Sequence, residues 1–366
     1  MTLQEFLSEW NNDSPLLRVH TSGSTGKPKP IWVEKQRMLN SARITCDFLG
    51  LQKHDTALLC MPLDYIAGKM VVVRTLERGM QLLSVKPSGH PLSSESLQQL
   101  ANPERPITFA AMVPLQVYNS LQIPEERERL MQIKHLIIGG GAIDEKLSEE
   151  LKDFPNAVWS TYGMTETLSH IALRRLNGPQ ATEWYTPFEG IEVRLNHEKC
   201  LTINAPVVCS QTLVTNDIAE LQTFKTDENK AFVRFRIIGR KDNVIDSGGV
   251  KIQIEELERT LKPHLSGDFA ITSITDEKFG EAVVLLTTLT DITIVDAICK
   301  NILPKFWQPR HIFHTANIPQ TETGKPARAN IKQLAKQINK QAESMNIYAI
   351  NRQNTARESY KIACSR

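Results

Sequence analysis

Short apolar runs alternate with helix-like segments through the first two-thirds of the sequence, and this alternation constrains the fold more than any other feature. Thr56–Leu63, His135–Ile138 and Ala157–Ser160 are apolar runs of a length typical of buried strands. Between the last two runs, apolar side chains recur at helical spacing from Ile143 to Leu151. Strands that alternate with helices predict a layered α/β domain.

A different pattern begins near Ile191, where short apolar runs follow one another without helical segments between them. Closely spaced runs of this kind predict a small β subdomain at the end of the large domain. The expected strands are Ile191–Leu195, Cys200–Ile203, Gln211–Val214 and Ala231–Arg236.

The pattern changes again at Gly239, and the segment after it predicts an α+β unit of about 100 residues, a normal domain size. A length of 366 residues is enough for two domains. We therefore predict a large N-terminal domain over residues 1–239, a small C-terminal domain over residues 240–345 and a polar tail over residues 346–366. The helices and strands expected in the small domain are Glu255–Leu261, Phe269–Thr275, Ala282–Thr288, Ile294–Ile302 and His311–His314.

Composition and charge exclude several classes of protein. The 43 basic and 41 acidic side chains nearly balance, which gives no reason to expect nucleic acid or an anionic membrane surface as the main partner. Six scattered cysteines without a Cys-x-x-Cys pair argue against structural zinc and a disulfide framework. We find no signal peptide and no apolar window long enough to span a bilayer. A reduced, cytoplasmic protein is expected, and homo-oligomerisation stays open.

A loop rich in glycine and hydroxyl groups lies near the N-terminus. Glycines let the backbone approach an anion closely, and hydroxyls and amides donate hydrogen bonds to phosphate oxygens. The same residue types also form ordinary surface turns. A Walker A loop is excluded because Lys27 is followed by Pro28. The residues concerned are Thr21, Ser22, Gly23, Ser24, Thr25, Gly26, Lys27 and Lys29.

This loop resembles the phosphate loop of the adenylate-forming superfamily, which contains acyl- and aryl-CoA ligases. Four further motifs follow in the superfamily's order, and the five together extend from residue 21 to residue 328. The resemblance implies ATP and CoA as co-substrates and Mg²⁺ as a cofactor.

Tyr162–Thr167 matches the superfamily's second motif at every defined position. The resemblance implies that Tyr162 belongs to the nucleotide site, that Thr165 contacts the phosphates and that Glu166 holds Mg²⁺. One carboxylate with phosphate oxygens is a usual set of Mg²⁺ ligands. It also implies that the run Gly139, Gly140 and Gly141 lies beside the adenine.

Asp217 lies where the superfamily has an aspartate that accepts hydrogen bonds from the ribose hydroxyls. The preceding glycine of that motif is replaced by Asn216, a residue that also tolerates positive φ. Without the resemblance, Asp217 would be interpreted as an ordinary turn aspartate.

The motif that begins at Gly239 joins the two domains in the superfamily. The resemblance implies that Arg240 reaches the ribose or phosphate and that Asp242 is the hinge. Gly248 and Gly249 suit a narrow channel for the pantetheine arm of CoA, although a plain hairpin turn would also use a glycine pair.

Lys325 lies in the last motif, which extends from Pro319 to Arg328. The resemblance makes Lys325 the catalytic lysine between the substrate carboxylate and the α-phosphate. A cation at that place stabilises the charge that develops as the carboxylate attacks phosphorus.

The acyl substrate is indicated by residues that differ among the superfamily's members. The stretch from Met61 to Arg74 resembles the o-succinylbenzoate–CoA ligases of menaquinone biosynthesis, in which a cation at the position of Arg74 accompanies a dicarboxylic substrate. Ser169 and His170 resemble the same group and are expected near the aromatic ring. Considered alone, Arg74 would be expected to extend its charged end to the surface.

We therefore expect a ligase that joins CoA to o-succinylbenzoate through an acyl-adenylate, in a large α/β domain that is shortened at its N-terminus relative to most of the superfamily. An impaired, truncated paralogue is the less favoured interpretation. Three alternatives stay open. They are another aryl- or acyl-CoA ligase, an amino-acid-adenylating enzyme in which Asp64 pairs with the substrate ammonium, and an AMP-binding regulatory module without turnover.

Overall fold

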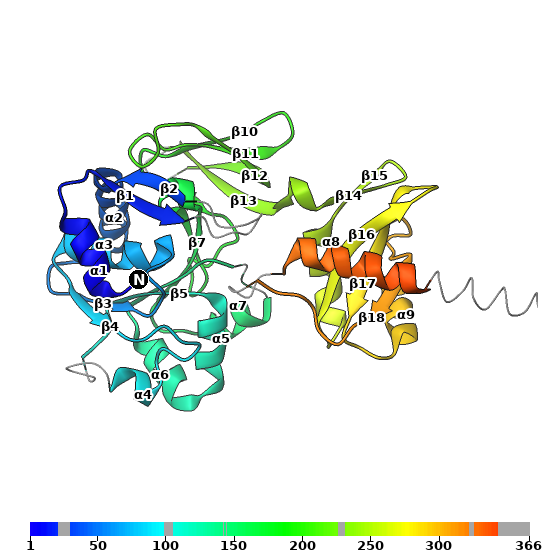
Figure 1. The fold of residues 1–366 in the computed structure, drawn as a ribbon, viewed down its shortest axis with the longest axis horizontal. Helices are drawn as coiled ribbons and strands as arrows, with labels where there is room; N and C mark the ends of the chain where they lie inside the picture. Colours follow the sequence, from blue (N-terminus) through cyan, green and yellow to red (C-terminus); the bar gives the residue numbers. More distant parts are fainter. Residues whose placement is uncertain are drawn as a thin grey trace, which may run out of the picture. The chain divides into compact units, whose positions relative to one another are not determined.

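A computed structural model describes residues 1–20, 30–98, 105–141, 143, 145–225, 231–321 and 326–342 (Figure 1). The described residues form two compact units, one within residues 1–237 and one within residues 238–342. The sequence predicted this boundary two residues later, after Gly239. The predicted polar tail, residues 346–366, lies outside the described residues.

A seven-stranded sheet in the order β4-β3-β5-β6-β7-β8-β9 is the centre of the large unit. Its first five strands are parallel, and β8 and β9 are antiparallel to their neighbours. The layered α/β prediction is therefore confirmed. The strands are β3 (Thr56–Leu59), β4 (Gln81–Ser84), β5 (Phe109–Met112), β6 (His135–Ile138), β7 (Ala157–Gly163), β8 (His170–Arg175) and β9 (Thr186–Pro187).

Helices of the large unit connect these strands, and α2 and α3 pack directly against each other (Figure 1). Apolar residues of the helices and strands form one continuous core. Strand β3 ends at Leu59, four residues earlier than predicted, because Pro62 lacks a backbone donor and a turn follows at Tyr65. The helices are α1 (Leu3–Asn11), α2 (Lys35–Leu49), α3 (Ile66–Arg78), α4 (Ser94–Leu97), α5 (Pro114–Gln122), α6 (Pro124–Gln132) and α7 (Glu145–Leu151).

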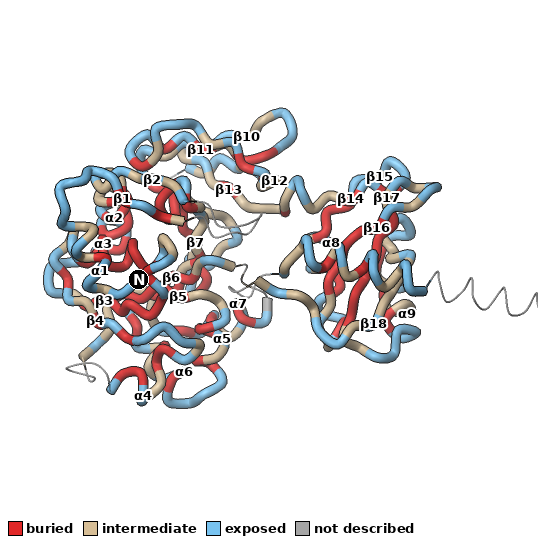
Figure 2. Tube along the Cα trace, viewed as in Figure 1, coloured by how far each residue is buried: buried red, intermediate tan, exposed pale blue. Residues whose placement is uncertain are grey.

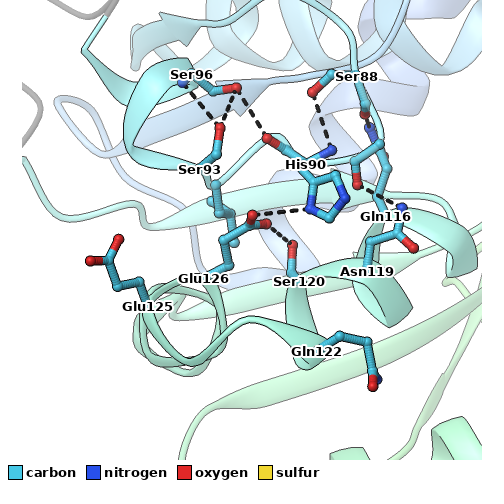
Figure 3. A network of polar contacts seen from close by, with 12 residues as sticks. Ser88, His90, Ser93, Ser96, Gln116, Asn119, Ser120, Gln122, Glu125 and Glu126 are labelled. Carbon is cyan, nitrogen blue, oxygen red and sulfur yellow. Dashed lines mark hydrogen bonds and ion pairs between the residues drawn. The ribbon is translucent and has the colours of Figure 1, made fainter.

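A polar network joins α5, α6 and the segment before α4 (Figure 3). Glu126 is only 2% exposed, and its carboxylate accepts a hydrogen bond of 2.9 Å from the Ser120 hydroxyl and contacts Nδ1 of His90 at 3.0 Å. The amide of Gln116 donates to the backbone carbonyls of Cys60 and Ser88. Because buried polar groups are costly without partners, these bonds fix the segment against the two helices.

The predicted β subdomain is an antiparallel sheet in the order β10-β11-β12-β13. Its strands are β10 (Glu192–Leu195), β11 (Cys200–Asn204), β12 (Leu213–Lys225) and β13 (Ala231–Arg240). Strand β12 is much longer than predicted, because it continues through polar residues that pair with its neighbours. A separate hairpin of β1 (Leu16–His20) and β2 (Pro30–Glu34) places His20 opposite Pro30, at the two ends of the glycine-rich loop.

The small unit is the predicted α+β domain. Its sheet has the order β15-β14-β17-β16, with β18 parallel to β17. Strands β16 and β17 are mostly buried (Figure 2). Alternate residues of these strands face opposite sides, so that Ile271 and Val283 belong to one apolar cluster and Ala270 and Val284 to another. The elements are β14 (Val244–Ser247), β15 (Val250–Gln253), α8 (Ile254–Leu261), β16 (Phe269–Asp276), β17 (Gly280–Thr287), α9 (Ile292–Ile302), β18 (His311–His314) and a helix over residues 328–342.

In the part of the chain that the structure describes, no helix is long and apolar enough to cross a membrane. The five described cysteines are all free thiols.

Replacing Arg328 by Ala should destabilise the small unit by about 1–3 kcal/mol, the usual range for lost hydrogen bonds to a charged group. Its Nη1 and Nη2 donate to the two oxygens of Glu258 at 2.7 and 2.6 Å, and the same carboxylate accepts from the backbone N–H of Ile271. Hydrogen exchange of peptides from β16 and β17 measures this change. Lys300→Ala, which removes an exposed pair with Asp296 on α9, should cost less than about 0.5 kcal/mol. Equal losses in the two variants would contradict the prediction.

Candidate active site

The glycines after β6 lie at the edge of the sheet where the parallel strands end. In open α/β sheets this edge is where ligands bind. A Cβ at Gly139 would lie 2.4 Å from Oγ1 of Thr161 on β7, and Gly140 has φ of +78°. Larger residues at these two positions would clash or be strained, so the backbone of this turn stays bare. A bare backbone is compatible with the predicted place of the adenine beside Gly139–Gly141.

Tyr162 and Asp217 form a direct contact between the large sheet and the β subdomain. The Tyr162 hydroxyl donates a 2.6 Å hydrogen bond to Oδ2 of Asp217. The Tyr162 ring packs edge-on against Phe235, with ring centroids 5.0 Å apart. The structure therefore brings together two residues that the sequence predicted for the nucleotide site.

The expectation that Asn216 replaces the glycine because it adopts positive φ is wrong. Asn216 and Asp217 lie inside strand β12, and Asn216 is not among the described residues with positive φ. Asp217 is therefore a strand residue, not a turn aspartate. The pairing of β11 with β12 is irregular between Cys200 and Thr202, and this irregularity lies where Asn216 replaces the glycine of the superfamily.

A tight turn after β7 separates the metal-site candidate from the acyl-site candidates. Thr165–Thr167 forms a 3-10 helix, followed by Leu168 in the left-handed region with φ of +66°. The Thr167 hydroxyl donates to the carbonyl of Ser169 at 2.7 Å. As a result, Thr165 is buried and Glu166 is exposed, while the chain turns back so that His170 begins the neighbouring strand β8.

Arg74 is buried, with only 1% of its surface exposed, and so does not extend to the surface. Its Nη2 donates to the Ser169 hydroxyl at 2.7 Å and to Oγ1 of Thr45 at 3.4 Å. The Ser169 hydroxyl also contacts Nδ1 of His170 at 3.2 Å. The three acyl-site residues predicted from the sequence, Arg74, Ser169 and His170, therefore lie in one hydrogen-bonded group.

The charge of Arg74 is held without a carboxylate. Among the described residues, no carboxylate lies within ion-pair distance of its guanidinium, and its buried Nε has no hydrogen-bond partner. Burial lowers the pKa of Arg74 to about 10, and burial together with the Arg74 charge lowers the pKa of His170 well below its ordinary value. A buried cation with an unused donor is suited to an anionic ligand.

Thr45 belongs to this group and was missed by the sequence reasoning. It is fully buried on α2, where Met38, Ala42 and Cys46 are also buried. A threonine within the apolar face of a helix was the available signal. Its partners could not be inferred, because they come from α3 and β8.

The remaining described candidates belong to the small unit. Nη2 of Arg240 donates to Oδ2 of Asp242 at 2.8 Å. Gly248 and Gly249, with φ of +62° and +82°, form the turn between β14 and β15, and the N–H of Gly249 donates to Asp246. The geometry is that of a glycine hairpin turn, and the CoA role of this pair stays a prediction.

Two of the predicted sites lie outside the described part of the chain. They are the catalytic candidate Lys325 and the phosphate loop, with Thr21, Ser22, Gly23, Ser24, Thr25, Gly26 and Lys29.

The described residues contain no group of three or more histidine, cysteine or acidic side chains that could hold a metal ion. Glu166 makes no hydrogen bond or ion pair with another described residue, so that its exposed carboxylate fits a site in which phosphate oxygens supply other ligands.

Comparison with known proteins adds to this geometry. The sequence profile of AMP-binding enzymes matches residues 4–203. The "2-succinylbenzoate--CoA ligase" of Escherichia coli K12 is 28% identical over 301 residues, which cover 79% of this chain and 62% of that protein. The protein of the same name from Haemophilus influenzae is 25% identical over 290 residues, which cover 76% of this chain and 60% of that protein. The chain thus spans about three-fifths of the length of these two relatives.

Solved structures share the fold. An acyl-CoA synthetase (AMP-forming)/AMP-acid ligase II-like protein from Dyadobacter fermentans is 31% identical, with a TM-score of 0.58 and coverage of 89% of this chain and 91% of that one. The o-succinylbenzoate CoA synthetase from Bacillus subtilis, in complex with ATP and magnesium, has a TM-score of 0.65 at 22% identity, with coverage of 86% and 69%. The profile match covers more than half of the 366 residues, and the chain belongs to the family of AMP-binding enzymes.

Proposed function

We propose that this protein ligates CoA to o-succinylbenzoate, using ATP and passing through an acyl-adenylate. The names of the two curated relatives described above support this substrate, and so does the agreement of the motif residues with that group of ligases. The proposed substrate carries an aliphatic carboxylate, which is activated, and a ring carboxylate, which needs a separate binding group.

The buried guanidinium of Arg74 is the observation that carries the proposal. A cation removed from water is costly unless an anion or several hydrogen bonds compensate it. The described residues give Arg74 two hydroxyl partners, Ser169 and Thr45, and leave Nε unpaired. The ring carboxylate of the substrate would supply the missing negative charge through charge-assisted hydrogen bonds.

In the first proposed step, an oxygen of the aliphatic carboxylate attacks the α-phosphorus of ATP, and the bond to pyrophosphate breaks. Lys325 stabilises the charge that develops, and the loop Thr21–Lys29 binds the phosphates. Tyr162 and Asp217, joined by their 2.6 Å hydrogen bond, bind the ribose. Glu166, beside Thr165, would hold Mg²⁺, which neutralises phosphate charge when bound.

In the second proposed step, the sulfur of CoA attacks the acyl carbonyl, and the bond to AMP breaks. We propose that Asp242 is the hinge of a domain movement between the two steps, with Arg240 as a nucleotide contact and Gly248–Gly249 lining the path of the pantetheine arm. Movement about one residue at the end of an element is a known mode of domain closure.

An amino-acid-adenylating enzyme is the nearest alternative. It would use Asp64 to pair with a substrate ammonium, but the Asp64 side chain is 63% exposed to solvent, where an ion pair contributes little. Pyrophosphate exchange with amino acids against o-succinylbenzoate separates these two activities. A regulatory AMP-binding module would bind AMP but would release no pyrophosphate when a panel of aryl acids is tested with CoA. Another aryl- or acyl-CoA ligase would release pyrophosphate faster with benzoate or a fatty acid than with o-succinylbenzoate.

Lys325→Ala should abolish most adenylate formation while sparing the thioester step, because the lysine acts on the charge that develops at phosphorus. Pyrophosphate release measures the first step, and conversion of supplied acyl-adenylate with CoA measures the second. We expect a loss of about 100-fold or more in the first step. Lys336→Ala, which changes an exposed lysine of the helix over residues 328–342, should leave both steps unchanged. Equal loss of both steps in Lys325→Ala would refute the assignment.

Arg74→Ala should remove the preference for the dicarboxylic acid. We expect KM for o-succinylbenzoate to rise by about 10- to 100-fold, the equivalent of one lost charged hydrogen-bonding group. KM for the analogue that lacks the ring carboxylate should change little. Arg129→Ala removes an arginine that donates to Leu92 and Ser94 elsewhere in the same unit, and it should leave both values unchanged. An unchanged preference in Arg74→Ala would show that Arg74 does not bind the ring carboxylate.

A further inference from the structure

The hydroxyl of Thr45 is the point at which three elements of the large unit meet. Its Oγ1 donates to the backbone carbonyl of Ser41 at 3.1 Å, one helical turn earlier on α2. The same oxygen lies 3.0 Å from Nε2 of His170 on β8 and 3.4 Å from Nη2 of Arg74 on α3. The side chain is fully buried, so that water does not substitute for any of these partners.

The tautomer of His170 follows from the number of hydrogen atoms that its hydroxyl partners, Thr45 and Ser169, can donate. A threonine hydroxyl has one hydrogen, and here Ser41 accepts it. Oγ1 of Thr45 must then accept from His170, which places the imidazole hydrogen on Nε2. Nδ1 is left as an acceptor, and the Ser169 hydroxyl donates to it at 3.2 Å.

The reverse arrangement is worse. With the hydrogen on Nδ1 of His170, the Ser169 hydroxyl would accept from both His170 and Arg74, and its own hydrogen would have no acceptor among the described residues. Thr45 would have to donate to Nε2 and would lose its bond to Ser41. The Nε2–H form uses every hydroxyl hydrogen, which is the rule for buried polar groups.

The same bonds hold Arg74. Its hydrogen bonds to described residues all come from Nη2, one to Ser169 and one to Thr45, and its Nε has none. The guanidinium also lies over the Phe109 ring, with Cζ 5.9 Å from the centroid. One nitrogen is thus fixed by two hydroxyls while another donor is left unused.

We propose that Thr45 is a positioning residue of the acyl-binding site, whose hydroxyl keeps His170 in the Nε2–H form and, together with Ser169, fixes Nη2 of Arg74 so that the rest of the guanidinium is left for an anionic group of the substrate. The identity of that group as the ring carboxylate rests on the proposed function. The positioning of His170 and Arg74 by Thr45 is independent of it.

Thr45→Val tests this assignment, because valine has nearly the same shape and lacks the hydroxyl. The first readout is the tautomer of His170, measured by nitrogen-15 NMR of histidine-labelled protein, with the signals assigned by a His170→Gln variant. We expect the wild type and Thr45→Ser to show the Nε2–H form. In Thr45→Val the Nδ1–H form should become populated, since Nε2–H loses its acceptor.

The second readout is KM for two substrates, o-succinylbenzoate and its analogue without the ring carboxylate. Thr45→Val should raise KM for o-succinylbenzoate by about tenfold, as expected for a misplaced charged hydrogen bond, and change KM for the analogue by less than about twofold. Thr45→Ser should restore the wild-type ratio. Ser120→Ala, which removes a buried hydroxyl from the separate network around Glu126, should lower the melting temperature without changing the ratio or the His170 signals.

The two readouts distinguish failure of this proposal from failure of the proposed function. An unchanged His170 tautomer in Thr45→Val overturns the positioning role, and so does an equal rise of KM for both substrates. If the wild type does not convert o-succinylbenzoate, the proposed function fails, and the NMR result alone decides whether Thr45 positions His170. A shifted tautomer would then still support the role assigned to Thr45.

Discussion

The buried charge of Arg74 sets the conditions for the candidate acyl site. A guanidinium taken out of water must be compensated, and in this protein hydroxyl groups do so in place of a carboxylate. Thr45 on α2 and Ser169 beside β8 reach it only because α2 packs against α3 and because the turn after β7 brings the chain back alongside that strand. The packing of α2, α3 and the turn before β8 therefore determines which hydrogen bonds compensate the buried Arg74 guanidinium.

The parallel sheet gathers the remaining candidates of the large unit. Parallel strands end at a common edge, so the glycines after β6 and Tyr162 at the end of β7 lie at neighbouring strand ends. Tyr162 then extends this edge to the β subdomain through Asp217. The same hydrogen bond ties the orientation of a tyrosine ring to the position of a carboxylate, so one substitution would disturb both.

Much of the fold could be predicted from the sequence. The β6 and β18 strands have the predicted bounds, and α8 and β16 differ from theirs by one residue, because these elements have strong local apolar patterns and clear breaks. Strand β12 could not be delimited, since its polar second half is a strand only through pairing with its neighbours. Arg74 shows the same limit in the site. Its local pattern favoured a surface arginine, whereas packing of α2 against α3 buries it.

The family, the order of the motifs and the residue types available for phosphate, ribose and carboxylate binding can all be inferred from the sequence, because they depend on which residues follow one another. Which side chains meet depends on the folded chain. Thr45, Arg74 and His170 are far apart along the chain, and their hydrogen bonds exist because three elements converge around one buried group. The tautomer of His170 follows from the number of hydrogens in that group. No sequence pattern records that number, since it depends on which atoms lie within hydrogen-bond distance.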